Sequence, residues 1–169
     1  MAKLPSCFTR HARLNDHFRR GVTAVEFAML APTFFLMLMG ITETSLMMGA
    51  QQLLENAAFN TSRLAKTGYT GAGQTQAQSV NQILMNELQS YGTLITTKNV
   101  TMTESAYNSF SAAGSGTGGT AGYGTQQQIV VYTVTYPWKL FTPMLSAFMG
   151  TSGVVNLTST IVVRNEPYG

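Results

Sequence analysis

The sequence predicts an α+β protein: a long amino-terminal helix, half membrane-spanning and half amphipathic, followed by a small antiparallel sheet and a second helix. Three observations in the 169 residues predict this class. Residues 22–41 form an apolar run as long as the roughly 20 residues that cross a bilayer. Residues 44–67 keep apolar side chains at helical spacing. Beyond residue 97, short segments alternate polar and apolar residues as strands do.

The first 20 residues are strongly basic. They hold one acid, Asp16, against five positive residues: Lys3, Arg10, Arg13, Arg19 and Arg20. The rest of the chain has five basic and six acidic residues, so it has no basic face suited to nucleic acid. A basic segment before an apolar run predicts a cytoplasmic amino terminus and a translocated carboxy-terminal part, with Arg19 and Arg20 fixing this topology.

Residues 22–43 are predicted to be a retained transmembrane helix. The apolar run exceeds the 7–15 residues of a signal-peptide core, and residues 40–47 offer no small-residue cleavage site. Glu26 is an acid inside this run, and burying a carboxylate in lipid costs a few kcal/mol, so a functional role is the first hypothesis. Pro32 removes one backbone hydrogen bond and favours a kink, which membrane helices tolerate when neighbours repair it.

The helix is predicted to continue as an amphipathic segment over residues 44–67, so that residues 22–67 form one helix. Small residues recur four positions apart along it, as Ala24 with Ala28 and Ser45 with Gly49. Such pairs let membrane helices approach closely. The alternative, given equal weight, is that these residues only reflect the usual composition of membrane spans.

Residues 68–169 are predicted to form an outer α+β domain after a glycine-rich turn. The pattern predicts a helix over 74–91, strands over 98–105, 128–136 and 154–163, and a flexible loop over 111–125. Both faces of the second strand are β-branched or aromatic, which predicts a central strand, and Pro137 is expected to end it. Trp138–Met149 is predicted to be a short helix or loop that packs in the core. The alternative is an exposed docking patch or membrane-surface contact.

The spacing around Gly21 carries a family resemblance. Residues 21–27, GVTAVEF, resemble a type IV prepilin cleavage site: a basic leader, a glycine, four residues, a glutamate, and an aromatic residue opening an apolar helix. The chain over about residues 20–68 resembles the TadE-like family of the Flp (tight adherence) pilus assembly system. Weaker similarity returns in VTYPWKLFTPML and IVVRNEP.

This resemblance implies a pilin-like fold and a minor pilin or pseudopilin of the bacterial inner membrane, single-pass, with its carboxy-terminal domain periplasmic and a possible place in the pilus. It implies cleavage by a prepilin peptidase between Gly21 and Val22, with Phe27 as part of the recognised motif. The implied partners are that peptidase, other pilins and minor pilins, and the inner-membrane assembly platform. Residues 1–21 would then be a leader peptide.

Glu26 has a physical role available after such cleavage. The new α-ammonium of Val22 lies one helical turn from Glu26, so the two charges share a face, and pairing relieves the cost of burying the carboxylate. In a staggered bundle Glu26 meets the amine of a neighbouring subunit instead. The alternative is an acid that reaches the headgroup region without a partner.

Residues for catalysis or cofactor binding are poorly placed in this sequence. Cys7, His11 and His17 lie before Gly21 and lack a fourth metal ligand. The glutamates beyond the apolar run do not cluster, and the GxGxxG match at 114–119 lacks the strand, helix and acid of a nucleotide site. We therefore expect no enzyme, cofactor or metal. Two functions stay open: a pilus assembly subunit, or an unprocessed single-pass membrane protein whose outer domain binds an envelope partner or ligand.

Overall fold

The computed structural model of the protein describes residues 9–148 and 153–167. Cys7 and Met149, the last residue of one predicted segment, lie outside the described residues. The chain forms two compact units. The amino-terminal unit ends at Thr42, and the carboxy-terminal unit begins at Glu43.

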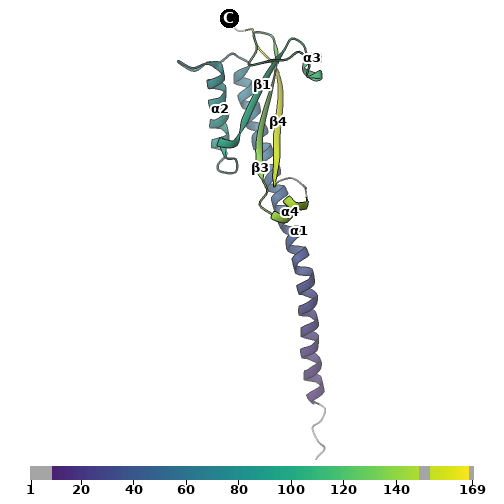
Figure 1. Cartoon of the computed structure of the whole chain (residues 1–169). Coiled ribbons are helices and arrows are strands. Elements are labelled where there is room, and N and C mark those ends of the chain that lie inside the picture. The colour runs from purple at the N-terminus through teal and green to yellow at the C-terminus, as the bar shows by residue number, and fades with distance from the viewer. Residues whose placement is uncertain (1–8, 149–152, 168–169) are drawn as a thin grey trace, which may run out of the picture. The chain divides into compact units, whose positions relative to one another are not determined.

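The long helix α1 spans Thr9–Ala65 and runs through Pro32 (Figure 1). It confirms the predicted long helix but begins well before residue 22. The segment from Thr9 to Arg20 holds neither glycine nor proline, and Gly21 alone costs a helix only about 1 kcal/mol. The helix ends at Ala65 because Gly68 follows with a positive φ of 70°, a conformation that glycine adopts without strain.

Helix α2 spans Gln76–Ser90, as predicted, and begins with a capping box. Thr75 Oγ1 accepts a hydrogen bond from the Gln78 amide at 3.3 Å, and Gln78 Oε1 accepts one from the Thr75 amide at 3.0 Å. These two bonds satisfy donors that a helix start otherwise leaves unpaired. The buried face of α2 consists of Ser79, Val80, Leu84 and Leu88.

The sheet is antiparallel with the order β2-β1-β3-β4. Its strands are β1 (Thr101–Tyr107), β2 (Thr120–Ala121), β3 (Ile129–Lys139) and β4 (Val154–Arg164). The small antiparallel sheet and the central place of β3 confirm the predictions. β1 starts later than predicted, because Thr97–Asn99 form the 3₁₀ helix η1.

Two local predictions are wrong. Pro137 does not end β3, because the pairing with β1 stops at Thr135 and the strand continues beside β4 alone. A proline, which has no N–H to donate, is tolerated where one side of the strand lacks a partner. The predicted flexible loop holds the helix α3 (Phe110–Ser115) and β2. Ser109 caps α3 at its start, and Gly116 ends it with a φ of 65°.

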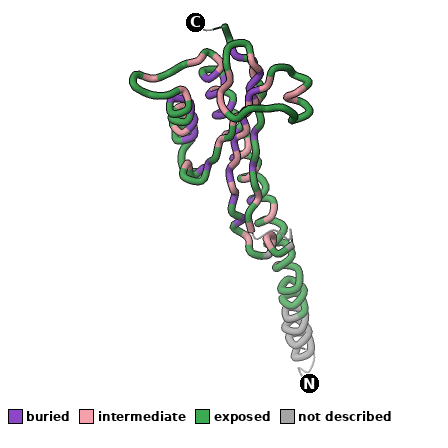
Figure 2. The backbone as a smooth tube through the Cα atoms, turned by 45° about the horizontal axis from the view of Figure 1, so that its top comes forward, coloured by how far each residue is buried: buried purple, intermediate pink, exposed green. Residues whose placement is uncertain are grey.

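One face of the sheet packs on the helices. Along β3 alternate residues are buried (Figure 2). Along β4 the buried residues are Leu157 and Ser159, which lie two positions apart and so share one face of the strand. One core cluster joins α1, α2 and β3. It contains Ala50, Leu54, Ala57 and Ala58 of α1, Leu84 and Leu88 of α2, and Val134, Tyr136 and Trp138 of β3. The part of α1 from Glu43 onward is therefore a wall of this core. The segment predicted to pack in the core, Trp138–Met149, does so only in part. Leu140 is buried, whereas Phe141 is exposed just before the short helix α4 (Pro143–Phe148).

Candidate functional site

The apolar part of α1 is solvent-exposed in the isolated chain. From Val22 to Ile41 every residue except Ala31 and Gly40 is exposed (Figure 2). The exposed large side chains include Phe27, Phe34 and Phe35. Helix α1 is long and apolar enough to cross a membrane, and none of its most apolar stretch is buried by the chain itself. Exposed apolar area costs about 25 cal/mol per Å² in water, so this surface is suited to lipid or to other apolar helices.

The residues of the predicted processing site lie within α1. Arg19, Arg20 and Gly21 belong to the helical backbone, and Val22, Glu26 and Phe27 follow on the same helix with exposed side chains. Val22 and Glu26 are four residues apart, so they share one helix face. Gly21 lowers helix stability locally, which makes the peptide bond after it easier to unwind than one between better helix formers.

The predicted packing residues fall in two different environments. Ala24, Ala28 and Pro32 follow each other at intervals of four residues on the exposed helix face. Ser45 is exposed too. Gly49 is half-buried, and a Cβ added to it would lie 4.0 Å from Leu94 Cδ2 of the same chain. The carboxy-terminal unit therefore occupies space beside Gly49, while the face with Ala24 and Ala28 is open to a neighbouring helix.

Glu43 is a functional candidate that sequence reasoning missed. It follows the apolar run directly, yet it is only 3 % exposed. Its two carboxylate oxygens accept hydrogen bonds from the backbone amides of Phe141 and Thr142, at 2.5 Å and 3.2 Å. Charge-assisted bonds of this kind offset the cost of burying a carboxylate. The first residue of the carboxy-terminal unit thus ties α1 to the junction between β3 and α4.

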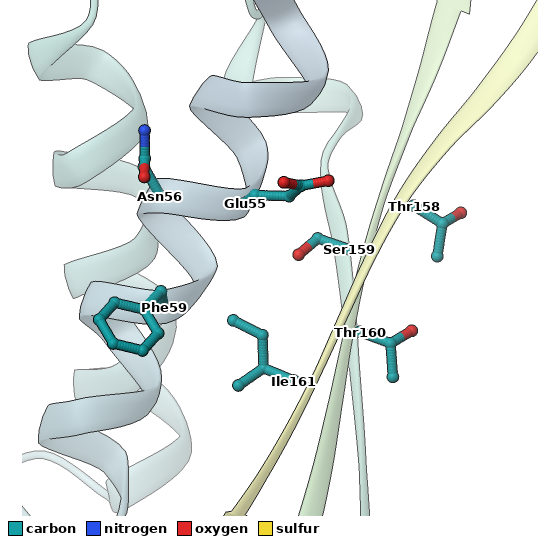
Figure 3. A pocket seen from close by; sticks show the side chains of 7 residues that line it. All are labelled: Glu55, Asn56, Phe59, Thr158, Ser159, Thr160 and Ile161. Atoms are coloured by element: carbon teal, nitrogen blue, oxygen red, sulfur yellow. The ribbon is translucent and has the colours of Figure 1, made fainter. Parts of the chain in front are cut away.

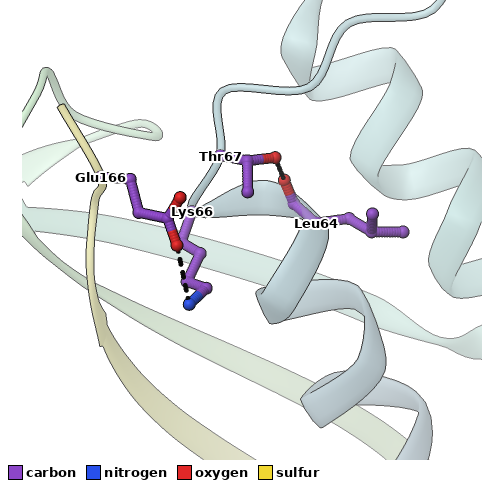
Figure 4. A network of polar contacts seen from close by, with 4 residues as sticks. All are labelled: Leu64, Lys66, Thr67 and Glu166. Atoms are coloured by element: carbon purple, nitrogen blue, oxygen red, sulfur yellow. Dashed lines mark hydrogen bonds and ion pairs between the residues drawn. The ribbon is translucent and has the colours of Figure 1, made fainter. Parts of the chain in front are cut away.

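The other end of α1 is tied to the carboxy terminus of β4. Glu166 donates its backbone N–H to the Lys66 carbonyl at 2.9 Å, and its carboxylate pairs with Lys66 Nζ at 2.9 Å (Figure 4). The buried Asn165 donates from Nδ2 to the carbonyls of Tyr123 and Thr125, at 2.8 Å and 3.0 Å. The two weakly similar segments, VTYPWKLFTPML and IVVRNEP, therefore contact the two ends of this half of α1.

Between these ends, α1 and β4 border an open hollow of about 340 Å³. Figure 3 shows Ser159 and Ile161 turned toward α1, and Thr158 and Thr160 turned away from it. Gln51 bridges the two elements, donating to the Thr158 carbonyl at 3.0 Å and to Glu55 Oε1 at 2.8 Å. Glu55 is the single ionisable residue among those that line the hollow, so the lining supplies no acid–base pair.

Glu104 on β1 and Tyr123 in the segment after β2 have shifted pKa values. Burial raises the pKa of the Glu104 carboxyl above its usual range. Burial, with a smaller effect of the Glu104 charge, raises the pKa of the Tyr123 phenol to about 12. Both shifts favour the protonated forms, as expected for acids withdrawn from water. Within the described part of the chain, no group of three or more His, Cys, Asp and Glu residues is arranged to hold a metal ion.

Comparison with known proteins gives one match, which covers most of α1. The family model described as TadE-like protein matches residues 21–63. The match begins at the predicted cleavage glycine and ends two residues before α1 does. No curated protein and no solved structure matches the chain. The chain therefore carries a TadE-like segment over residues 21–63, as the resemblance in its sequence predicts.

Proposed function

We propose that the protein is a non-enzymatic minor pilin or pseudopilin of a Flp-type pilus assembly system. The observation that carries this proposal is the coincidence of the TadE-like match with an exposed apolar stretch of α1 that starts one residue after Gly21. An apolar helix surface of this length needs lipid or neighbouring helices to cover it. A pilin is covered first by lipid and then by neighbouring helices, since it rests in the membrane before it packs in a filament.

In this function the basic leader stays on the cytoplasmic side of the inner membrane, and the carboxy-terminal unit lies in the periplasm. A prepilin peptidase cuts between Gly21 and Val22, removing Arg19 and Arg20 with the leader. The released amine and Glu26 then form a neutral pair within the apolar layer, inside one subunit or between staggered neighbours. The face with Ala24 and Ala28 packs against the other pilins, and the assembly platform accepts the processed subunit.

The test is the amino terminus of the membrane-bound protein, measured by mass spectrometry of tryptic and intact protein from cells with a working prepilin peptidase. We expect the mature chain to begin at Val22. The matched control is a strain that lacks the peptidase, in which the leader should remain. A chain that keeps its leader in both strains contradicts the proposal and supports the unprocessed single-pass protein instead.

A further inference from the structure

Strand β4 forms one edge of the sheet, and this edge is long and unprotected. Its 11 residues pair with β3 without interruption, so no bulge disturbs the strand. The strand holds no proline, no lysine and no acid, and Arg164 at its end carries the single charge. Proteins usually shorten, charge or cover such edges, because an open strand pairs readily with another chain. The opposite edge follows that rule, since β2 has only 2 residues.

The hydrogen bonds of β4 show which of its backbone groups point away from the sheet. Leu140 donates to the carbonyl of Gly153, just before β4, so the odd-numbered residues bond to β3. The even-numbered residues therefore direct their N–H and C=O groups outward. The carbonyl of Thr158 fits this alternation, because it accepts from the Gln51 side chain of α1. Within the described part of the chain, it is the one outward backbone group of residues 154–164 that has a hydrogen-bond partner.

The open edge borders the hollow between α1 and β4. Ser159 and Ile161 line the hollow from β4, and Glu55 and Phe59 line it from α1 (Figure 3). The Phe59 ring is 55 % exposed, and Glu55 is exposed as well. The free backbone groups of the edge thus lie beside an apolar surface and a negative charge.

We propose that an extended segment of a partner protein pairs with β4 as a fifth strand along residues 156–162. The backbone of that segment bonds to the free N–H and C=O groups, and the Gln51 side chain turns aside from Thr158. Helix α1 limits the length of the added strand, because Glu166 already donates its amide to the Lys66 carbonyl. The proposal concerns the carboxy-terminal unit alone and depends neither on processing nor on membrane anchoring.

The hollow specifies the side chains of the added strand. Residues directly opposite each other in paired strands lie on the same face of the sheet. The partner residue opposite Ser159 therefore lies near Glu55, which favours lysine or arginine there. The partner residue opposite Ile161 lies near Phe59, which favours an apolar side chain.

A second copy of the chain is a poorer occupant than a different protein. Pairing β4 with its own copy along most of the strand requires a two-fold axis near Ser159. Such an axis brings the two Glu55 carboxylates toward each other, because Glu55 lines the hollow beside Ser159. Like charges that face each other across paired strands are destabilising. The charge of the site thus selects a basic strand from another protein.

A synthetic strand tests the site on the full-length protein in detergent. The probe is the capped peptide Val-Thr-Leu-Thr-Lys-Thr-Val, which in antiparallel pairing places lysine opposite Ser159 and leucine opposite Ile161. Fluorescence anisotropy of the labelled peptide measures binding, and hydrogen exchange locates it. We expect slower exchange at the outward amides of Thr160 and Val162. A peptide that does not bind at millimolar concentration, or that protects neither amide, overturns the proposal.

Backbone methylation of the peptide gives a matched control that leaves the protein unchanged. N-methylation of the threonine opposite Thr160 removes an N–H that points toward β4 and should weaken binding about tenfold. N-methylation of the lysine opposite Ser159 removes an N–H that points away from β4, so the affinity should hardly change. Equal effects of the two methyl groups contradict the proposal, because the peptide is then not paired as a strand.

Variants of Glu55 test the charge of the site. Glu55→Gln should weaken binding about threefold, as expected for loss of an exposed ion pair. Glu55→Lys should weaken it further, and replacing the peptide lysine by glutamate should restore affinity for this variant. Without such recovery, the basic character assigned to the partner strand is wrong.

Sedimentation of the free protein tests the alternative occupant. Thr160→Pro removes an outward N–H of the edge, whereas Thr160→Val keeps it. We expect no dimer that depends on this N–H. A dimer that Thr160→Pro dissociates and Thr160→Val preserves contradicts the proposal, because β4 then pairs with its own copy.

Discussion

At the scale of single residues, the buried Glu43 links α1 to the junction between β3 and α4. Replacing it by alanine removes two charge-assisted hydrogen bonds to the backbone amides of Phe141 and Thr142. We expect Glu43→Ala to lower the free energy of unfolding by about 2 kcal/mol. Denaturant unfolding in detergent, followed by Trp138 fluorescence, measures this loss.

The exposed Glu55 on the same helix is the matched control for Glu43. Glu55→Ala should change stability by no more than about 0.5 kcal/mol, since its hydrogen bond from Gln51 is solvent-exposed and surface substitutions seldom do more. Glu43→Gln should lower stability less than Glu43→Ala but more than Glu55→Ala, because it keeps a hydrogen-bond acceptor but loses the charge. Equal stability of the Glu43 and Glu55 variants would show that the buried carboxylate does not hold the β3–α4 junction.

Tyr123 gives a pH-dependent prediction. Its pKa rises from 10.0 to about 12 on folding, so the folded state holds the proton more tightly. The resulting stabilisation is present below pH 10 and is lost as the pH rises toward 12. Because the Glu104 charge contributes to the shift, Glu104→Gln should let Tyr123 ionise at lower pH. Phenolate absorbance during titration measures this, with Tyr123→Phe assigning the signal and Tyr69→Phe as the exposed control.

Glu26 is the residue on which assembly depends in the proposed function. Glu26→Ala should still enter the membrane, because it makes the span more apolar, but should lose most of its incorporation into the assembled apparatus. Glu26→Asp keeps the charge and should retain much more of this incorporation. Co-purification with other pilins and immunodetection of surface pili measure both. Normal piliation with Glu26→Ala would leave the acid without its assigned role.

At the scale of elements, the start of α2 is the clearest case of local sequence control. Thr75→Ala removes one half of the capping box and should cost about 1 kcal/mol of stability. Thr70→Ala, in the exposed turn before it, should cost much less. Thermal unfolding by circular dichroism compares them, and equal melting temperatures would mean that the cap contributes nothing measurable.

Elements with a strong local signal were predicted well, and those defined by distant partners were not. The periodicity around Val80, Leu84 and Leu88 predicts α2, and alternation predicts β3. The end of β3 depends on where β1 stops pairing, which no local pattern around Pro137 contains. The glycine-rich segment 111–125 resembles a loop because its helix is short and its strand Thr120–Ala121 exists only by pairing with β1.

The candidate site likewise has residues that a local pattern predicts and residues that only distant contacts define. Gly21, Glu26 and the apolar run are local, so their spacing suffices to suggest processing and a span. Glu43 and Phe141 are 98 positions apart, and only the folded chain brings them together. Glu43 gave one weak signal, an acid placed directly after the apolar run. Nothing in the sequence indicated that its side chain would be buried.

At the scale of the whole molecule, the proposed processing would reverse the sign of the formal charge. Removing residues 1–21 takes away five of the ten basic residues and one of the seven acids, which changes the formal charge from +3 to −1. The unprocessed chain has an isoelectric point near 9.2, and the mature chain should focus in the acidic range. Isoelectric focusing of the protein from strains with and without the peptidase measures the difference. A basic isoelectric point in both strains means that the leader is retained.

The hydrogen bonds of Glu43 also have a mechanical consequence for the proposed function. A pull on a subunit anchored by residues 22–41 would pass along the chain to Glu43, whose hydrogen bonds to the amides of Phe141 and Thr142 would pass part of the force into the long paired strands β3 and β4. At the far end, Lys66 and Glu166 join the segment after β4 to the end of the same helix. In the proposed function, tension on a subunit within a fibre would thereby be shared between the helix and the sheet of the carboxy-terminal unit.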